Sequence, residues 1–262
     1  LPFSEVLAEA QRLGYAEADP TFDIEGVDAA HKLTLLSSIA FGVPIRFDKA
    51  HIEGISRLAQ EDIRYAEELG YRIKLLGITK ARLEGIELRV HPTLIAAQRV
   101  MANVEGAMNA VMVKGDAVGA TLYYGQGAGE EPTASAVVAD LVDVTRLHTA
   151  DPEHRVPHLA FQPDAITDRP MLSIEDITTS YYLRLAATDQ PGVLADITRI
   201  LADASISIVS MIQKPREDAT QADIIFLTHE ALERNVNAAI ARIEALPTVV
   251  STVTRLRIEN LA

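Results

Sequence analysis

The stretch 181-YYLRLAATDQPGVLADITRILADASISIVSMIQ-213 changes periodicity twice and decides the fold of the C-terminal third of the chain. Residues 181–187 are dense in aromatic and aliphatic side chains, which is typical of a buried strand, whereas residues 192–202 repeat apolar side chains at helical spacing. Further segments continue the series, with strands expected over 206–213, 223–228 and 249–258 and a helix over 232–246. This βαββαβ order within roughly 80 residues predicts a ferredoxin-like unit.

The part of the chain before this unit mixes helices and strands in another order. Apolar periodicity predicts helices that are each followed by a glycine, over residues 4–13, 27–41 and 60–69. Strand patterns follow at residues 72–78, 86–90, 107–113 and 117–124, and a last helix is expected over 132–146. The fold class is therefore α+β, with a mixed α/β domain and its sheet preceding the ferredoxin-like unit.

The segment between these two parts differs in composition from both. Residues 149–180 contain four prolines and many polar side chains, which indicates a linker that runs over the surface. We therefore expect three units, a first domain over residues 1–150, a linker over 151–179 and a second domain over 180–262.

Composition and charge exclude several classes of function. The 262 residues carry a formal net charge of −13, which repels nucleic acids and anionic membranes, so we expect neither as a partner. The absence of cysteine excludes disulfides and thiolate metal sites and fits a cytoplasmic location. No apolar run approaches the ~20 residues that span a bilayer, and residues 1–4 do not resemble a signal peptide. The loosely spaced His148, His154 and His158 do not predict a metal site.

The candidate catalytic segment is 14-GYAEADPTFDIEGVDAAHKL-33, which is rich in carboxylates. Asp28 and Lys32 are four residues apart on the expected helix and therefore share a face. One interpretation is a solvated surface ion pair. The other is a site for a cationic amine, in which carboxylates hold the ammonium and the lysine exchanges a proton with a hydroxyl or carbonyl group. His31 lies about 100° from Lys32 around the helix and is expected to be a packing or surface residue.

This segment resembles the signature of homoserine dehydrogenases. Later motifs agree with the resemblance and occur in the same order, namely 91-HPT-93, 104-VEGAMNAV-111 and 125-GQGAGEEPTAS-135. The resemblance covers about residues 1–150. It implies a reversible hydride transfer between a nicotinamide cofactor and the pair L-homoserine and L-aspartate 4-semialdehyde, in threonine and methionine biosynthesis.

The resemblance also implies a role for each polar residue of the segment. Lys32 would mediate proton exchange with the substrate oxygen, and Asp28 would hold Lys32 in place. Glu17 and Asp23 would hold the substrate ammonium, and Tyr15 would line the same pocket. This chemistry suits the residues, because a cationic lysine stabilises the alkoxide that forms as hydride arrives.

The glycine loop 125–129 invites comparison with dinucleotide-binding motifs. Its G-x-G-x-G spacing is not that of the G-x-G-x-x-G fingerprint, and a plain strand-to-helix turn also explains the glycines. The family resemblance implies that the loop approaches the nicotinamide of NAD or NADP, with Gly127 and Gly129 as contacts. The main cofactor domain would precede Leu1, so we expect the 262 residues alone to be catalytically inactive.

The loop 189-DQPGVLA-195 lies between the first strand and first helix of the ferredoxin-like unit. Taken alone it is a turn. Together with the βαββαβ order it resembles an ACT domain, a regulatory module that binds amino acids at dimer interfaces. The resemblance implies an effector site at Asp189, Gly192, Val193 and Leu194, where backbone N–H groups hold a carboxylate. Threonine is the expected effector, and a homodimer or higher homo-oligomer is the expected assembly.

Other classes of protein share some of these features. A non-catalytic, ACT-type amino-acid-sensing module, a different ACT-bearing dehydrogenase or a dimerisation protein could each carry the C-terminal unit. The carboxylate-rich segment 14–33 favours homoserine dehydrogenase over all three.

Overall fold

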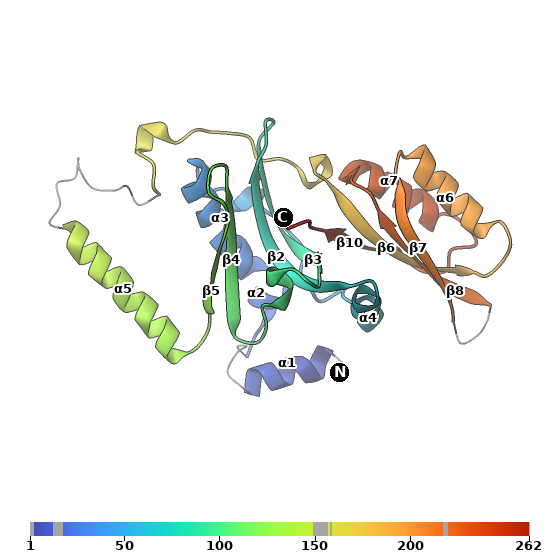
Figure 1. Ribbon diagram of the computed structural model, residues 1–262, viewed down its shortest axis with the longest axis horizontal. Helices are drawn as coiled ribbons and strands as arrows, with labels where there is room; N and C mark the ends of the chain where they lie inside the picture. The colour runs from blue at the N-terminus through green and yellow to red at the C-terminus, as the bar shows by residue number, and fades with distance from the viewer. Residues whose placement is uncertain (1–2, 13–17, 149–156, 158, 217–219, 262) are drawn as a thin grey trace.

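The computed structural model describes residues 3–12, 18–148, 157, 159–216 and 220–261 (Figure 1). Its N-terminal helices are α1 (Phe3–Arg12), α2 (Thr21–Ile24), α3 (Val27–Phe41) and α4 (Gln60–Glu68). The strands of this part are β1 (His51–Ile52), β2 (Tyr71–Ala81), β3 (Ile86–Ala96), β4 (Met108–Gly115) and β5 (Gly119–Gln126), followed by helix α5 (Glu130–His148). The helix predicted over residues 27–41 is confirmed at both ends.

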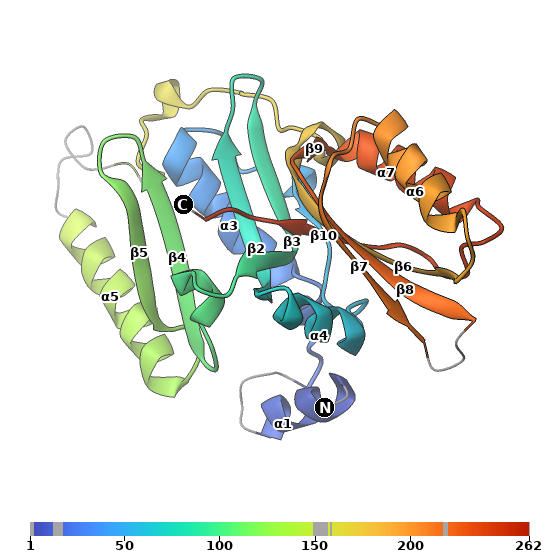
Figure 2. The same cartoon turned by 45° about the vertical axis from the view of Figure 1, so that its right-hand side comes forward.

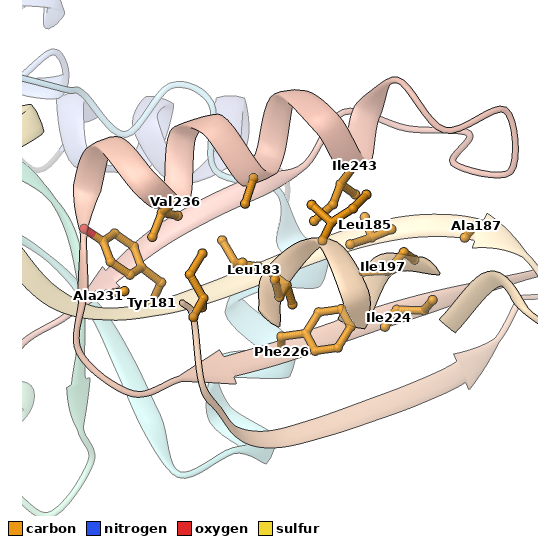
Figure 3. Close-up of a cluster of buried hydrophobic side chains, with 14 of the residues drawn as sticks. Tyr181, Leu183, Leu185, Ala187, Ile197, Ile224, Phe226, Ala231, Val236 and Ile243 are labelled. Atoms are coloured by element: carbon orange, nitrogen blue, oxygen red, sulfur yellow. The ribbon is translucent and has the colours of Figure 1, made fainter. Parts of the chain in front are cut away.

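The C-terminal unit begins at β6 (Thr178–Thr188). It continues through α6 (Val193–Asp203), β7 (Ile208–Pro215), β8 (Gln221–Thr228), β9 (Ala231–Leu232), α7 (Glu233–Glu244) and β10 (Thr254–Ile258). The four long strands lie in the order β10-β6-β8-β7 with antiparallel neighbours. Helices α6 and α7 cover one face, and side chains such as Leu183, Ile197, Phe226 and Ile243 fill the space between (Figure 3). The ferredoxin-like prediction is confirmed.

A single sheet runs through both parts of the chain. Strand β10 pairs with β6 on one side and, in parallel, with β3 on the other, so β1, β2 and β3 extend the C-terminal sheet. Neighbouring residues on β6 show how its two faces are used. Tyr181 points into the core beneath α6 and α7, whereas Tyr182 packs with Tyr65 of α4 and Leu256 of β10 in a second core.

Strands β4 and β5 form a separate two-stranded hairpin, and α5 follows it. Figures 1 and 2 show these elements on the side of the main sheet opposite to the C-terminal unit. No described residue of α5 is buried. The exposed large apolar side chains of these elements include Val111, Val113, Leu122, Tyr123, Tyr124, Val137, Val138, Leu141, Val142 and Val144.

Two expectations for secondary structure are wrong. Residues 21–24 form the short helix α2, although the sequence patterns predict no helix between residues 13 and 27. The Asp19 side chain, one residue before the N-cap Pro20, accepts hydrogen bonds from the backbone N–H and the hydroxyl of Thr21. The last strand was expected from residue 249 but begins at Thr254. Side-chain hydrogen bonds interrupt the ladder before it, since Ser251 accepts from the Ala186 N–H and Glu244 from the Val253 N–H.

Residues 159–172 of the expected linker contact the first part of the chain, whereas residues 174–177 contact α7 and residues 178–179 already belong to β6. The Thr167 N–H donates to the Gly42 carbonyl, and Ile86 exchanges hydrogen bonds with Pro170 and Leu172. Among the described residues, no helix combines the length and apolar character needed to cross a membrane.

Candidate active site and effector site

The turn between α2 and α3, here called the α2–α3 corner (residues 21–32), carries three of the predicted site residues. Gly26 forms the turn with φ of +78° and is buried. A Cβ at this position would lie 3.0 Å from the Val90 side chain, so the close packing of the corner on β3 requires glycine here. Ala30 and Leu33, on the inner face of α3, pack against Leu88 and Val90.

The outer face of α3 holds the predicted ion pair. The Lys32 Nζ lies 2.5 Å from Asp28 Oδ2, which confirms that the two side chains share a face. They remain accessible, with 69% of the Lys32 side chain and 35% of the Asp28 side chain exposed. An ion pair in such a position adds little to stability, so the pair is available for chemistry without being needed for the fold.

Asp23 lies on α2, one turn before Gly26, and is exposed. The orientation of α2 is fixed by a stack of three rings, in which His31 lies between Phe22 and Phe47. The centroid distances are 5.7 Å to Phe22 and 3.9 Å to Phe47. His31 is exposed and stacked on both rings, which agrees with the expectation that it is a packing or surface residue. The stack holds the helix that carries Asp23 against the helix that carries Asp28 and Lys32.

Two predicted substrate-binding residues, Tyr15 and Glu17, lie outside the described residues.

The glycine loop joins β5 to α5. The Gly127 N–H donates to the Ala107 carbonyl, and a Cβ on Gly127 would lie 1.9 Å from the Asn109 amide nitrogen. Gly129 has φ of +126°. The close approach of Asn109 explains the glycine at position 127, and the positive φ explains the glycine at position 129. Both residues are exposed at the start of α5. Because β5 belongs to an antiparallel hairpin, this strand–loop–helix is not a Rossmann unit.

The predicted effector loop borders a hollow of about 270 Å³ in the C-terminal unit. Asp189, Val193 and Leu194 line it, together with Gln213 of β7. Gly192, with φ of +97°, precedes the first residue of α6, and a Cβ there would meet open space. The first amides of a helix have no partner within the helix. The Gln213 side-chain amide donates to Asp189 Oδ1 at 3.0 Å and so fixes that carboxylate at the rim.

The sequence analysis overlooked a group of buried charges. Arg257, Glu233, Arg89 and Glu259 are each at least 95% buried and lie where β10 meets β3 and α7. The signal that could have revealed them is the alternation of charged residues along the two strands. Glu87 and Arg89 on β3, like Arg255 and Arg257 on β10, are two residues apart and so point to one face.

His91 lies among these charges. Its ring is fully buried, its Nε2 accepts a hydrogen bond from Arg89 Nη1 at 2.7 Å, and its Nδ1 lies 2.9 Å from the Thr93 hydroxyl. Burial, followed by the positive charges of Arg257 and Arg89, lowers the pKa of His91 well below its ordinary value. Among the described residues, no group of three His, Asp or Glu side chains is placed to hold a metal ion.

The fold joins a mixed α/β domain, which carries the α2–α3 corner, to a ferredoxin-like unit, which carries the hollow beside Asp189. The sequence model of the homoserine dehydrogenase family matches residues 1–142, and that of the ACT domain matches residues 181–248. The homoserine dehydrogenase of Pseudomonas aeruginosa is 61% identical over 99% of this chain and 60% of its own length, and that of Neisseria gonorrhoeae is 58% identical over the same shares.

Solved structures agree with these matches. The crystal structure of a homoserine dehydrogenase from Thiobacillus denitrificans is 71% identical, with a TM-score of 0.93 over 99% of this chain and 59% of that one. A Staphylococcus aureus homoserine dehydrogenase at 31% identity gives a TM-score of 0.70 over 99% of this chain and 60% of that one. The chain belongs to the homoserine dehydrogenase family, with an ACT domain at its C-terminal side. It spans about 60% of the length of the curated relatives it matches.

Proposed function

We propose that the whole protein is an NAD(P)-dependent homoserine dehydrogenase that interconverts L-aspartate 4-semialdehyde and L-homoserine in threonine and methionine biosynthesis. The observation that carries this proposal is the accessible Asp28–Lys32 pair, held beside Asp23 on the α2–α3 corner. Residues 1–150 would be the substrate-binding and catalytic domain, residues 151–179 the linker and residues 180–262 the regulatory domain. A cytoplasmic location is part of the same proposal, supported by the absence of cysteine.

The bound nicotinamide would supply or accept the hydride. Lys32 would donate a proton to the aldehyde oxygen during reduction and take it back from the homoserine hydroxyl during oxidation. Asp28, at 2.5 Å, would keep the ammonium group of Lys32 directed at that oxygen. Asp23, together with Glu17 and with Tyr15 along the pocket, would hold the substrate ammonium, since carboxylates form strong charge-assisted hydrogen bonds with amines.

The glycine loop and α5 would face the cofactor-binding part of the protein. Support comes from the exposed apolar side chains of α5, such as Val138 and Leu141, which are 57% and 61% exposed. A patch of this kind usually marks an interaction site. Gly127 and Gly129 at the start of α5 would then lie near the nicotinamide. The exposed apolar side chains of β4 and β5 support a homodimer or higher homo-oligomer.

Threonine would bind as a feedback effector in the hollow beside Asp189. Its carboxylate would take backbone N–H groups at Gly192, Val193 and Leu194, where the start of α6 favours an anion. Its ammonium would contact Asp189, whose Oδ1 is already fixed by Gln213. The size of the hollow suits a small amino acid.

The proposed activity is tested by following NAD(P)H absorbance as the purified complete protein oxidises L-homoserine. Saturable, homoserine-dependent reduction of either cofactor is expected. L-serine and L-threonine serve as control substrates, since they test whether the site requires the longer side chain. Equal turnover of all three, or none of homoserine, would contradict the proposal.

A further inference from the structure

Four charged residues form a compact group where the two parts of the chain meet, here called the junction cluster (Glu53, Glu233, Arg255 and Arg257). Glu53 follows β1, Glu233 begins α7, and both arginines lie on β10. The Arg257 guanidinium makes two contacts of 3.0 Å with the Glu53 carboxylate and two, of 2.5 and 2.9 Å, with Glu233. Arg257 is 1% exposed and Glu233 is fully buried, whereas 32% of the Glu53 side chain is exposed.

Glu53 is held by more than one partner. Its Oε1 also accepts from Arg255 Nη2 at 3.0 Å and contacts His51 Nε2 at 2.8 Å. Burial alone would raise the pKa of Glu53, but the hydrogen bonds from His51 and Arg257 and the charges of both arginines outweigh it and hold the pKa well below its usual range. Glu53 is therefore a fixed, ionised anchor.

The backbone after Glu53 lies directly on the α2–α3 corner. The Ile55 N–H donates to the Ile24 carbonyl at 2.8 Å. A Cβ at Gly54 would lie 2.6 Å from the Glu25 Cα, so the two backbones touch. On its other side, the Glu53 N–H donates to the Val90 carbonyl of β3. Only the two residues Gly54 and Ile55 separate the anchored carboxylate from the turn that carries Asp23 and Asp28.

We propose that Glu53 is a positioning residue that ties the α2–α3 corner, and with it the Asp28–Lys32 pair, to strand β10 of the ACT domain. It touches none of the groups assigned to the reaction and acts through the backbone of residues 54–55. The naming of homoserine as the affected substrate rests on the proposed function. The positioning role of Glu53 itself rests on the contacts of Glu53, Gly54 and Ile55.

The first test compares two variants of the complete enzyme, Glu53→Gln and Glu259→Gln. Glu259 is a matched control, because it follows β10 and is a carboxylate paired with Arg89 at 2.5 Å and Lys80 at 2.7 Å, neither of which belongs to the corner. Since a misplacement of ~1 Å can cost up to about 10²-fold, Glu53→Gln is expected to raise the homoserine KM about tenfold and to leave the cofactor KM within about twofold. Glu259→Gln is expected to change both KM values by less than about twofold.

The second test needs no activity. Amide hydrogen exchange in the complete protein should be faster at Ile55 and across residues 20–30 in Glu53→Gln than in the unmodified protein, and unchanged there in Glu259→Gln. If Glu53→Gln does not fold, Arg255→Gln removes one contact with the same carboxylate and should shift both readouts in the same direction by less.

The outcomes separate this inference from the proposed function. Equal effects of the Glu53 and Glu259 variants, or unchanged exchange at the corner in Glu53→Gln, would overturn the positioning role. Lack of homoserine oxidation by the unmodified enzyme would contradict the proposed function, while the exchange measurement would still decide whether Glu53 holds the corner.

Discussion

The α2–α3 corner and the junction cluster both pair opposite charges, but they place them in opposite environments. The Asp28–Lys32 pair lies on the surface, whereas Arg257 and Glu233 are almost fully buried. Exposed pairs typically contribute about 0.2–1 kcal/mol to stability. Removing one partner of a buried pair costs about 3–5 kcal/mol, because the remaining charge is left uncompensated. The charges assigned to chemistry can therefore be changed with little loss of stability, whereas changing the buried charges that join the two parts of the chain costs several times more.

The largest expected effect concerns the 262 residues by themselves. They should fold and associate but show no NADPH-dependent reduction of aspartate 4-semialdehyde, since we propose that Gly127 and Gly129 form only a small part of the cofactor site. The assay compares this chain with the complete protein at equal concentration, and circular dichroism and analytical ultracentrifugation check folding and association. Measurable turnover by the 262 residues would show that the cofactor site has been misplaced.

The next largest effect falls on the junction cluster. Arg257→Ala should lower the free energy of unfolding by about 3–5 kcal/mol, because it removes the paired contacts with Glu53 and Glu233 and leaves Arg255 as the arginine that still bridges them. Denaturant unfolding of the complete protein measures the change. The matched surface variant is Arg12→Ala, whose partner Glu9 lies on the exposed α1 and whose loss should cost less than about 0.5 kcal/mol. Similar costs for the two variants would remove the contrast between buried and exposed pairs.

The hollow beside Asp189 is a third site to compare with these two. A substitution there should change regulation by threonine and leave catalysis unchanged. Gly192→Asp places a negative charge where the threonine carboxylate is expected and should abolish threonine inhibition, a coupling of typically about 1–3 kcal/mol. Uninhibited kcat should stay within about twofold, since the site is separate from the corner. Calorimetric titration of threonine into both proteins is the check. Equal binding by the two would place the effector elsewhere.

The smallest expected effect is a gradual loss of stability in acid. The lowered pKa of buried His91 means that, below about pH 6.5, the unfolded chain takes up a proton that the folded chain does not, so stability falls as pH falls. Glu53, Glu233 and Glu259 have lowered pKa values, so their contribution is present above about pH 4.5 and is lost below it. Unfolding free energies measured from pH 8 down to about pH 2 should therefore decline in two stages, the first below about pH 6.5 and the second below about pH 4.5. A flat profile between pH 7 and pH 5 would argue against a neutral, buried His91.

Local sequence patterns predict many of the helices and strands of this molecule. They do not predict which strands, far apart in the sequence, pair with each other. The bounds of α3 and the shared face of Asp28 and Lys32 follow from helical periodicity and flanking glycines. The pairing of Arg257 on β10 with Thr93 on β3 joins residues far apart in the sequence, and no local pattern specifies it. The alternating charges on these strands could have been interpreted as solvated edges. Their burial becomes visible only once the two strands are side by side, which is why Glu53 was not among the predicted site residues.

The central claim is that Lys32 carries the chemistry on a corner whose fold does not depend on it. The most direct measurement is kcat for homoserine oxidation by the complete enzyme and its Lys32→Ala variant, together with their unfolding free energies. The account predicts a fall in kcat of at least about 10²-fold, the lower end for general acid–base catalysis, with an unfolding free energy within about 0.5 kcal/mol of the unmodified enzyme. A kcat near that of the unmodified enzyme would remove Lys32 from the mechanism and contradict the assignment of the site.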